Sequence, residues 1–372
     1  MGKSDKETFT HGFHPWFASF HPQVPRTFIK QFTSQGDTVL DPFCGSGTTL
    51  VEAKLAGIES IGIDVNPLAC LITKVKTTPI NDEKLSSCAN LLENISSNLN
   101  VLFGQTTLTK DKRALLEPKI PNFRNRDYWF KPHVLTELGT IKAHIDALKD
   151  NDLRDFCSVA LSSIIVGVSN QQHETKYKRV DKKVGLYATY KKFETKLKQM
   201  IDKLKEFNKV ASNRGCKVYC EDLRHCTSIE NETADLIVTS PPYLNAWDYN
   251  LYQKFRFYWL GFDRLKFRSV EIGAHLKHAY IKDSVKIYIE DMRLCLHQMY
   301  QMLRRGGHCS IVVGEAVVQG ERVDVGKILR DVATDLGFIS EKIYTRKIFG
   351  PHFSQSRSIG NKIERIIVLR KP

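Results

Sequence analysis

The sequence predicts an α/β protein whose mostly parallel sheet is interrupted by a long helical insertion. Short apolar runs, glycine turns and amphipathic helices alternate near the N-terminus, which is the pattern of a parallel sheet. This pattern stops after residue 76, gives way to helical periodicity, and resumes near residue 216. The last two strand-like runs, 338–348 and 362–370, are expected to pair in antiparallel fashion. We therefore divide the chain into 1–76, 77–215 and 216–372, with the first and last regions forming one sheet domain.

The composition is that of a soluble globular protein with a basic surface. Of the 372 residues, 42% are hydrophobic and 26% are charged, and no run of eighteen apolar residues occurs. We therefore expect a cytoplasmic protein without a membrane span. The formal net charge of +14 favours a polyanionic partner such as nucleic acid, although a solvated positive surface is the plainer alternative.

The cysteines give no reason to expect a metal or a disulfide framework. There are nine, an odd number, scattered through strand-like and helix-like segments, which is typical of reduced thiols. Cys216, Cys220, His225 and Cys226 lie close together in the sequence. Their spacing contains no CxxC pair, so we predict no metal site.

The segment 38–64 has the pattern of a Rossmann-like nucleotide-binding unit. A buried strand over 38–43 is followed by a tight turn with Gly45 and Gly47 and by a helix over 48–56. Glycines in such a turn let the backbone approach a ligand at the helix N-terminus. The next strand ends at Asp64, where a carboxylate can accept hydrogen bonds from ribose hydroxyls.

The charge of this turn argues against a dinucleotide. It has one GxG and no third glycine, and Asp41 stands at the strand end, where its carboxylate would repel a pyrophosphate but attract a cation. A nucleoside with a positive sulfonium, S-adenosyl-L-methionine, fits this charge better. Asp222, at the acidic end of the strand over 217–220, could accept a hydrogen bond from the adenine amino group.

A second motif follows the strand over 234–239. Two prolines end strand pairing and stiffen the turn Ser240, Pro241, Pro242, Tyr243. A hydroxyl, a carbonyl and an aromatic ring are thereby fixed at the carboxyl end of a strand, where open α/β sheets bind their ligands. This arrangement suits a small planar group that carries an amine.

The insertion combines helices with basic connectors. Periodicity predicts helices over 82–101, 131–149, 153–169 and 187–209, while the connectors 106–126 and 171–192 are rich in lysine and arginine. The second connector also contains tyrosines. Such loops could follow phosphates and stack on bases, or form part of an ordinary solvated insertion, and the sequence leaves both readings open.

Taken together, DPFCGSGTT (41–49) and TSPPY (239–243) resemble the motifs of S-adenosylmethionine-dependent amino-group DNA methyltransferases, specifically the cytosine-N4 type. The resemblance implies a class I methyltransferase sheet, double-stranded DNA as substrate and flipping of the target base. It also implies that the insertion contributes to target recognition, and that the arm over 14–25 covers the cofactor. The cofactor-binding residues expected on this basis are Phe20, Asp41, Pro42, Phe43, Cys44, Gly45, Gly47, Thr48, Asp64 and Asp222.

In that family the proline-rich turn holds the target base, so Ser240, Pro241, Pro242 and Tyr243 are the expected catalytic residues. Adenine enzymes usually begin this motif with Asp or Asn, whereas a leading serine is typical of cytosine-N4 enzymes. No Pro-Cys pair occurs, so covalent C5 methylation is not expected.

Several other readings stay open. An adenine-N6 DNA methyltransferase or a guanine-N2 RNA methyltransferase would share most of these features, and a nucleic-acid-binding module could retain the fold without catalysis. The resemblance further implies a restriction-modification or defence system, with a cognate restriction endonuclease as a candidate partner and association with the nucleoid in a prokaryote.

Overall fold

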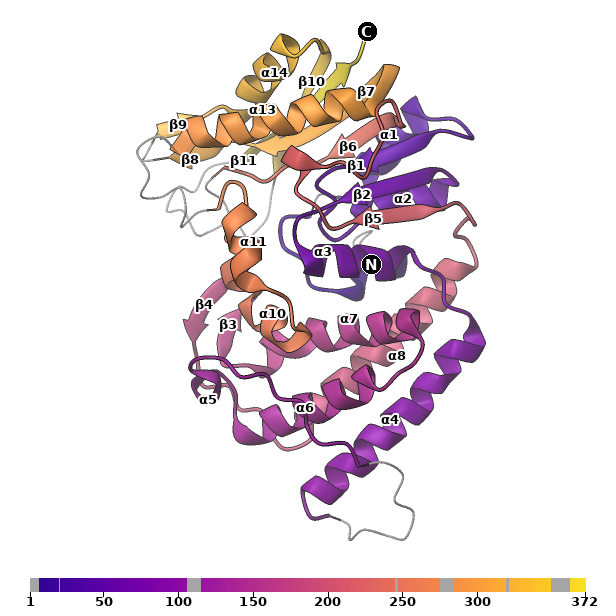
Figure 1. Cartoon of the computed structure of the whole chain (residues 1–372), viewed down its shortest axis with the longest axis vertical. Coiled ribbons are helices and arrows are strands. Elements are labelled where there is room, and N and C mark those ends of the chain that lie inside the picture. The colour runs from indigo at the N-terminus through magenta and orange to yellow at the C-terminus, as the bar shows by residue number, and fades with distance from the viewer. Residues whose placement is uncertain are drawn as a thin grey trace. The chain divides into compact units, whose positions relative to one another are not determined.

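The computed structural model describes residues 7–19, 21–105, 115–244, 247–274, 284–318, 321–348 and 362–372 (Figure 1). The chain forms two compact units. The helical unit comprises 1–18, 74–210 and 250–266, and the sheet unit comprises 19–73, 211–249 and 267–372. Two segments of the helical unit, 1–18 and 250–266, thus lie outside the insertion 77–215 that we expected from the sequence.

The sheet unit contains a seven-stranded sheet of order β10-β11-β7-β6-β1-β2-β5. Neighbours from β5 to β7 run parallel, whereas β11 is antiparallel to both β7 and β10. The predicted fold class and the antiparallel final pair are confirmed. The strands are β1 (Thr38–Asp41), β2 (Glu59–Ile63), β5 (Cys216–Tyr219), β6 (Ala234–Thr239), β7 (Leu303–Gly314), β10 (Ile339–Ile348) and β11 (Lys362–Arg370).

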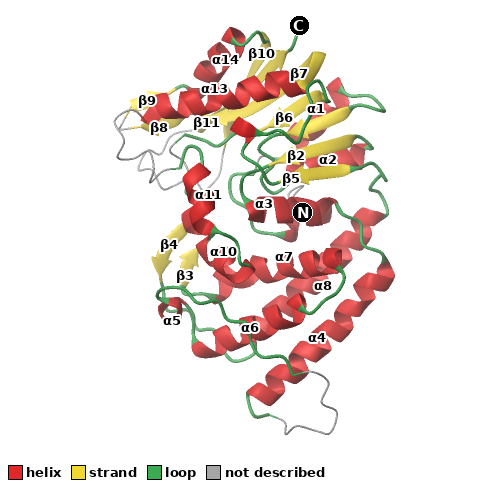
Figure 2. Ribbon diagram, in the orientation of Figure 1, coloured by secondary structure: helices red, strands yellow, loops and turns green. Residues whose placement is uncertain are grey.

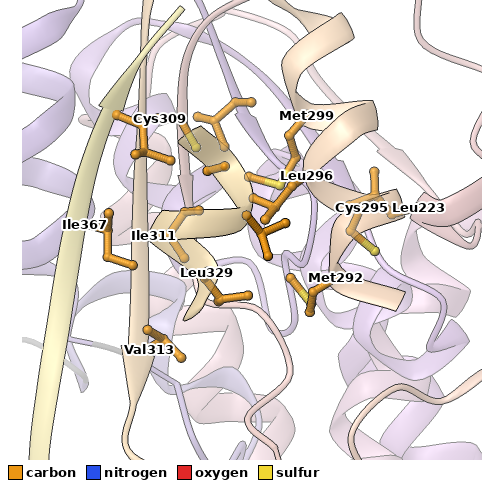
Figure 3. Packing of buried hydrophobic residues seen from close by; sticks show 14 of the residues in the cluster. Leu223, Met292, Cys295, Leu296, Met299, Cys309, Ile311, Val313, Leu329 and Ile367 are labelled. Atoms are coloured by element: carbon orange, nitrogen blue, oxygen red, sulfur yellow. The ribbon is translucent and has the colours of Figure 1, made fainter. Parts of the chain in front are cut away.

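Both faces of this sheet are apolar and contribute to hydrophobic cores. Successive residues of a strand point to opposite faces, so each strand supplies apolar side chains to both cores. One face packs against helices α13 (Ser284–Met302) and α14 (Val325–Asp335), with the core shown in Figure 3. The other face packs against α1 (Gln23–Phe32) and α2 (Thr48–Ala56). In β1, for example, Val39 belongs to the second core and Leu40 to the first. Near-continuous apolar runs are expected of strands covered on both faces.

The remaining helical elements of these regions are short or lie at the unit boundaries. They are α3 (Pro67–Thr77), the 3-10 turn η3 (Leu223–His225), α9 (Tyr249–Tyr252) and α11 (Arg264–Val270). None of the described helices is long and apolar enough to cross a membrane.

The helical unit is built from four long helices and several short elements (Figure 2). Asn81 and Asp150 cap two of the long helices by accepting the backbone N–H of Lys84 and Leu153, as expected of N-cap residues. The elements are η2 (Phe9–Phe13), α4 (Asp82–Leu102), α5 (Arg126–Trp129), α6 (Pro132–Asp146), α7 (Asn151–Val168), α8 (Ala188–Asn208) and α10 (Lys254–Leu260).

The sequence missed two small hairpins. In the helical unit, β3 (Gln171–His173) pairs with β4 (Lys176–Arg179) inside what we expected to be a basic connector. In the sheet unit, β8 (Ala316–Val318) pairs with β9 (Glu321–Val323). Strands of three or four residues are too short to show a period of two, which is why the pattern did not reveal them.

One boundary was also wrong. We expected Arg305, Gly306 and Gly307 to end the helix and the next strand to begin at His308. Instead α13 ends at Met302 and all three residues lie in β7. The backbone groups of Gly306 and Gly307 both hydrogen bond to Lys371, so pairing with the last residues of the chain extends the strand.

Candidate active site

The two sequence motifs meet at one edge of the sheet. β1 pairs in parallel with β2 on one side and with β6 on the other, so the carboxyl ends of all three strands lie at this edge. The Thr239 hydroxyl, at the end of β6, donates a 2.6 Å hydrogen bond to Asp41 Oδ1, at the end of β1. The structure therefore brings together the glycine turn and the proline turn.

Asp41 is an unusual carboxylate because it is buried and only half satisfied. It is 1% exposed, and Oδ1 also accepts the Phe43 N–H at 3.2 Å. Among the described residues, nothing hydrogen bonds to Oδ2. Burial raises the pKa of Asp41 to about 6, against the opposing effect of the Thr239 hydroxyl. A buried, partly unsatisfied carboxylate favours a nearby cation.

Packing within the sheet unit explains the glycine turn. Gly47 has a φ of +80°, and a Cβ there would lie 2.8 Å from the Thr73 side chain. A Cβ on Gly62 in β2 would lie 2.7 Å from Leu50 and 3.1 Å from Cys44. The backbone can close this turn only without those side chains. Cys44 itself is buried, and burial raises the pKa of its thiol.

Asp64 has a structural role, and the sequence left a helix N-cap open as the alternative to a contact with ribose. Its Oδ2 accepts the Gly45 N–H at 2.9 Å and its Oδ1 accepts the Asn66 N–H at 2.8 Å. The carboxylate thus joins the glycine turn to the start of α3. Burial raises its pKa to about 6, against the opposing effect of these N–H groups. Its predicted contact with ribose stays a prediction.

Asp222 is held in an ion pair. It caps η3, and both of its carboxylate oxygens accept hydrogen bonds from the Arg224 guanidinium, the closest at 2.5 Å. Arg224 also pairs with Asp291 of α13 at 2.6 Å. Burial raises the pKa of Asp222 and Arg224 lowers it, with a net decrease. The predicted contact with adenine stays a prediction.

The other expected cofactor residues are distributed as follows. Pro42 and Thr48 are buried, and Thr48 is the first residue of α2. Phe43 is partly buried against the first core. Phe20 lies outside the described residues.

The proline turn contains a directed series of hydrogen bonds. Ser240 Oγ donates to Tyr243 Oη at 3.4 Å, and Tyr243 Oη donates to Glu364 Oε1 at 3.1 Å. The other oxygen of Glu364 accepts a hydrogen bond from Arg346 Nε at 2.8 Å, and Arg346 Nη2 lies 2.6 Å from it in the same ion pair. Glu364 is 8% exposed and lies on β11, while Arg346 lies on the neighbouring β10.

Two further contacts fix the shape of this turn. Tyr288 of α13 donates its hydroxyl to the Pro242 carbonyl at 2.9 Å. Gly314, at the end of β7, lies so close to the Tyr243 ring that a Cβ there would be 3.0 Å from it. Among the described residues, none donates to the carbonyl of Pro241.

Sequence reasoning missed Glu364, Arg346, Tyr288 and Gly314. One signal was available for Glu364, because it is the only acidic residue in the otherwise apolar and basic run of 362–370. Nothing in the sequence connected it to the proline turn. Strand pairing across β7, β11 and β10 makes this connection.

The hairpin of the helical unit carries a basic, partly aromatic surface. Lys176, Lys178 and Arg179 of β4 are exposed. Among the described residues, neither lysine has an acidic partner. The Arg179 guanidinium lies 4.6 Å from the ring centroid of Tyr128, which is 54% exposed.

Buried contacts hold this hairpin in place. Arg256 of α10 is 1% exposed, and it donates one hydrogen bond to Glu174 in the hairpin turn at 2.8 Å. A second guanidinium nitrogen lies 2.7 Å from the other oxygen of Glu174 in the same ion pair. Lys254 donates to the Tyr177 hydroxyl at 3.1 Å. Because Glu174 is paired with Arg256, it does not neutralise the exposed cations of β4, and no other acidic residue that the structure describes pairs with them.

The cysteines and histidines form no metal centre in the described parts of the chain. Within those residues, no group of three or more His, Cys, Asp or Glu side chains could hold an ion. The nine cysteines are free thiols, and Cys220 is the one that is exposed.

Comparison with known proteins gives the following matches. A family model described as DNA methylase (N6_N4_Mtase) matches residues 2–75. The Type II methyltransferase M.MvaI of Kocuria varians is 29% identical over an alignment of 254 residues, which covers 64% of this chain and 54% of that protein. The Type II methyltransferase M.MjaII of Methanocaldococcus jannaschii is 23% identical over 395 residues, covering 85% and 74% of the two chains. This chain thus spans about half the length of the first relative.

The solved structures include a SAM-dependent methyltransferase from Methanosarcina mazei. It has 11% sequence identity and a TM-score of 0.36, with 92% of this chain and 96% of that chain covered.

Proposed function

We propose that this chain, which is similar to DNA methylases, is a DNA methyltransferase that transfers a methyl group from S-adenosylmethionine to the N4 amino group of cytosine. The family model and the Type II relatives support an amino-group DNA methyltransferase. Cytosine as the target base rests on Ser240, the serine that begins the proline turn.

The observation that carries this proposal is the hydrogen bond between Thr239 and Asp41. It couples the end of β6 to the end of β1, so that the turn suited to an amine and the turn suited to a cationic nucleoside lie side by side. Holding two reactants in a fixed mutual orientation is a large part of what catalysis of a group transfer requires.

The residues of the glycine turn fit the charge of the cofactor. The unsatisfied Oδ2 of Asp41 is a buried acceptor that a positive group would stabilise. Gly45 and Gly47 have no side chains that would keep a ligand away from this turn, and Asp64 is the acid at the end of the second strand. When bound, S-adenosylmethionine supplies an electrophilic methyl group on a sulfonium.

The proline turn fits the chemistry of the target. The exocyclic amine of cytosine is a poor nucleophile, because its lone pair is delocalised into the ring. Two acceptors, Ser240 Oγ and the Pro241 carbonyl, would hydrogen bond to its two N–H groups and localise this lone pair. The Pro241 carbonyl has no donor among the described residues, so it is available for this role.

Tyr243 would provide an aromatic surface for the base. A target atom inside a duplex is inaccessible, so the cytosine must be flipped out and held, and stacking on Tyr243 would contribute to holding it. No strong general base is needed, because the amine becomes acidic once it is methylated.

Duplex DNA as the partner is supported by the hairpin of the helical unit. Lys176, Lys178 and Arg179 provide uncompensated positive charge, and cations of this kind supply most of the sequence-independent affinity for DNA. A two-stranded β-ribbon also fits the major groove. We include the insertion 77–215 in the target-recognition region on this basis.

The test is to identify the methylated nucleoside. Unmodified DNA is incubated with the protein and S-adenosylmethionine, digested to nucleosides and analysed by mass spectrometry. The proposal expects N4-methylcytosine. If N6-methyladenine alone appears, or only RNA is modified, the cytosine assignment is wrong.

Two variants test the residues. Ser240→Ala and Tyr243→Ala are expected to bind the cofactor normally in calorimetry but to lose most turnover. Full activity of either variant on duplex DNA would contradict the assigned roles. Absence of cofactor binding by the wild-type protein would instead favour a binding module that retains the fold.

The Type II relatives also make a restriction-modification system the expected setting, with a cognate endonuclease as partner. Single-molecule sequencing of DNA from a host that expresses the protein would report the modified base and its sequence context. A modified site that a neighbouring nuclease gene product cleaves when unmethylated would support that setting.

A further inference from the structure

The hydrogen bonds that run from Ser240 through Tyr243 to Glu364 have a fixed direction. Arg346 can only donate, and its Nε donates to one oxygen of Glu364, with Nη2 of the same guanidinium 2.6 Å from that oxygen. The other oxygen of this carboxylate accepts from Tyr243 Oη at 3.1 Å. Because a phenol has one hydrogen, Tyr243 can then interact with Ser240 only as an acceptor.

The direction at Tyr243 determines the direction at Ser240. A serine hydroxyl also has one hydrogen, and here Ser240 Oγ donates it to Tyr243 Oη at 3.4 Å. Only the lone pairs of Ser240 Oγ then remain available for a hydrogen bond to a ligand. Ser240 can therefore accept a hydrogen bond from a ligand but has no hydrogen left to donate.

We propose that Glu364 is a positioning residue that acts through Tyr243 to keep Ser240 a hydrogen-bond acceptor, and thereby selects an amino group in the base site. This inference rests on the proposed function. An amino group offers the N–H donors that an acceptor requires, whereas the carbonyl oxygen that uracil and thymine carry at the same position offers none. An oriented acceptor is also what localises the lone pair of the amine.

The position of Glu364 in the fold supports this role. It is 8% exposed, lies on the central antiparallel strand β11, and is reached by Arg346 from the next strand. A buried carboxylate is costly unless it is paired and hydrogen bonded, so an isolated one here would destabilise the sheet. The pKa of the Tyr243 phenol is raised, first by burial and then by the charge of Glu364.

The activity test combines two variants in a double-mutant cycle. In Glu364→Gln, the side-chain amide can donate to Tyr243. This reverses the direction of the hydrogen bonds that run from Ser240 through Tyr243 to position 364. With unmethylated plasmid DNA and radiolabelled cofactor, we expect its kcat to fall about tenfold, the effect of losing one oriented hydrogen bond, with cofactor affinity unchanged. Tyr243→Phe breaks the connection, so adding Glu364→Gln to it should cause no further loss.

A matched control is available on the same two strands. Glu341 of β10 pairs with Arg370 of β11 at 2.8 Å, away from the proline turn, with both side chains about one third exposed. Glu341→Gln should leave kcat unchanged. Equal loss in this control, the same factor of loss in the Tyr243→Phe background, or full activity of Glu364→Gln would each overturn the inference.

A second measurement needs no turnover. In protein labelled with 3-fluorotyrosine, the fluorine resonance of Tyr243 is assigned by its absence in Tyr243→Phe. Its chemical shift at pH 7 should differ in Glu364→Gln, because the phenol then accepts from residue 364 instead of donating to it, and an identical resonance position in both proteins would show that the bond is not made. If this shift occurs but the wild type methylates nothing, the proposed function fails while the hydrogen-bond series stands.

Discussion

Asp41 and Thr239 lie 198 positions apart in the sequence and share a 2.6 Å hydrogen bond at the edge of the sheet. This bond links the two motifs that define the candidate active site. It satisfies only one oxygen of a carboxylate that is almost fully buried. The titration of Asp41 should therefore be visible both in cofactor binding and in stability.

We first expect cofactor affinity to depend on pH. The pKa of Asp41 is raised to about 6, so its negative charge is lost as the pH falls through 6. Because an anionic Asp41 attracts a sulfonium, and the ionised fraction of a group with a pKa of about 6 falls about fourfold between pH 7.5 and 5.5, the affinity for S-adenosylmethionine should fall by up to about fourfold over this range in calorimetry. Asp41→Asn should bind weakly at both values. A wild-type affinity that is constant across this range would contradict the role of Asp41.

The contribution of Asp41 to the free energy of unfolding should change with pH in the direction opposite to the cofactor affinity. The pKa of Asp41 is about 6 in the folded protein against a usual value of 3.8, so the folded state binds the proton more tightly. The stabilisation from this proton is complete below pH 3.8 and is lost as the pH rises through 6. At pH 8, Asp41→Asn should therefore be more stable than the wild type, by up to about 3 kcal/mol.

Denaturant unfolding at pH 8 and pH 4 checks this expectation. The advantage of Asp41→Asn should disappear at pH 4, where the wild-type carboxyl is mostly neutral as well. A variant that is less stable than the wild type at pH 8 would show that the buried charge is compensated.

Substitutions at two glycines distinguish the cost of backbone strain from the cost of steric crowding. Gly36 and Gly47 both have positive φ, +98° and +80°, but a Cβ on Gly36 meets nothing within 4 Å, whereas one on Gly47 would lie 2.8 Å from Thr73. We expect Gly36→Ala to cost about 1 kcal/mol and Gly47→Ala to cost several. Thermal unfolding measures the difference, and equal costs would mean that Thr73 moves aside easily.

Asp222 requires a measurement of both stability and binding. Its carboxylate is paired with Arg224, which also bonds to Asp291 of α13. Asp222→Asn should lower the free energy of unfolding by about 1–3 kcal/mol, because it weakens a largely buried ion pair. If Asp222 also contacts the adenine of the cofactor, affinity for S-adenosylmethionine falls at temperatures where the variant is folded. Unchanged affinity would assign Asp222 to the ion pair alone.

The basic hairpin should determine the salt dependence of DNA binding. Each phosphate contact contributes about 0.9 to the slope of log K against log salt concentration. Lys176→Gln/Lys178→Gln should therefore reduce this slope by about 1.8 for a mixed-sequence duplex, as measured by fluorescence anisotropy. The control, Lys198→Gln/Lys209→Gln, removes two exposed lysines of the same unit from the α8 region. An equal reduction in the control would indicate a general charge effect.

Much of the fold could be predicted from local patterns. The bounds of α2 and β6 are those expected, and α4, α7 and α8 begin and end within about two residues of the predicted positions. These elements are long or have clear caps and glycine stops, so local sequence determines them. The hairpins β3–β4 and β8–β9 are too short to show a period, and they depend on contacts with neighbouring elements.

The candidate site divides in the same way. The sequence by itself determined the two motifs, because turn geometry and strand ends depend on residues that are adjacent in the chain. The tertiary structure decided which side chains surround them. It linked Arg224, the neighbour of Asp222, to Asp291 of α13, joined Asp64 to the Gly45 backbone, and placed Glu364 within hydrogen-bond distance of Tyr243. These contacts join residues that lie far apart in the sequence, and a local pattern carries no information about such pairs until the packing of the strands and helices is known.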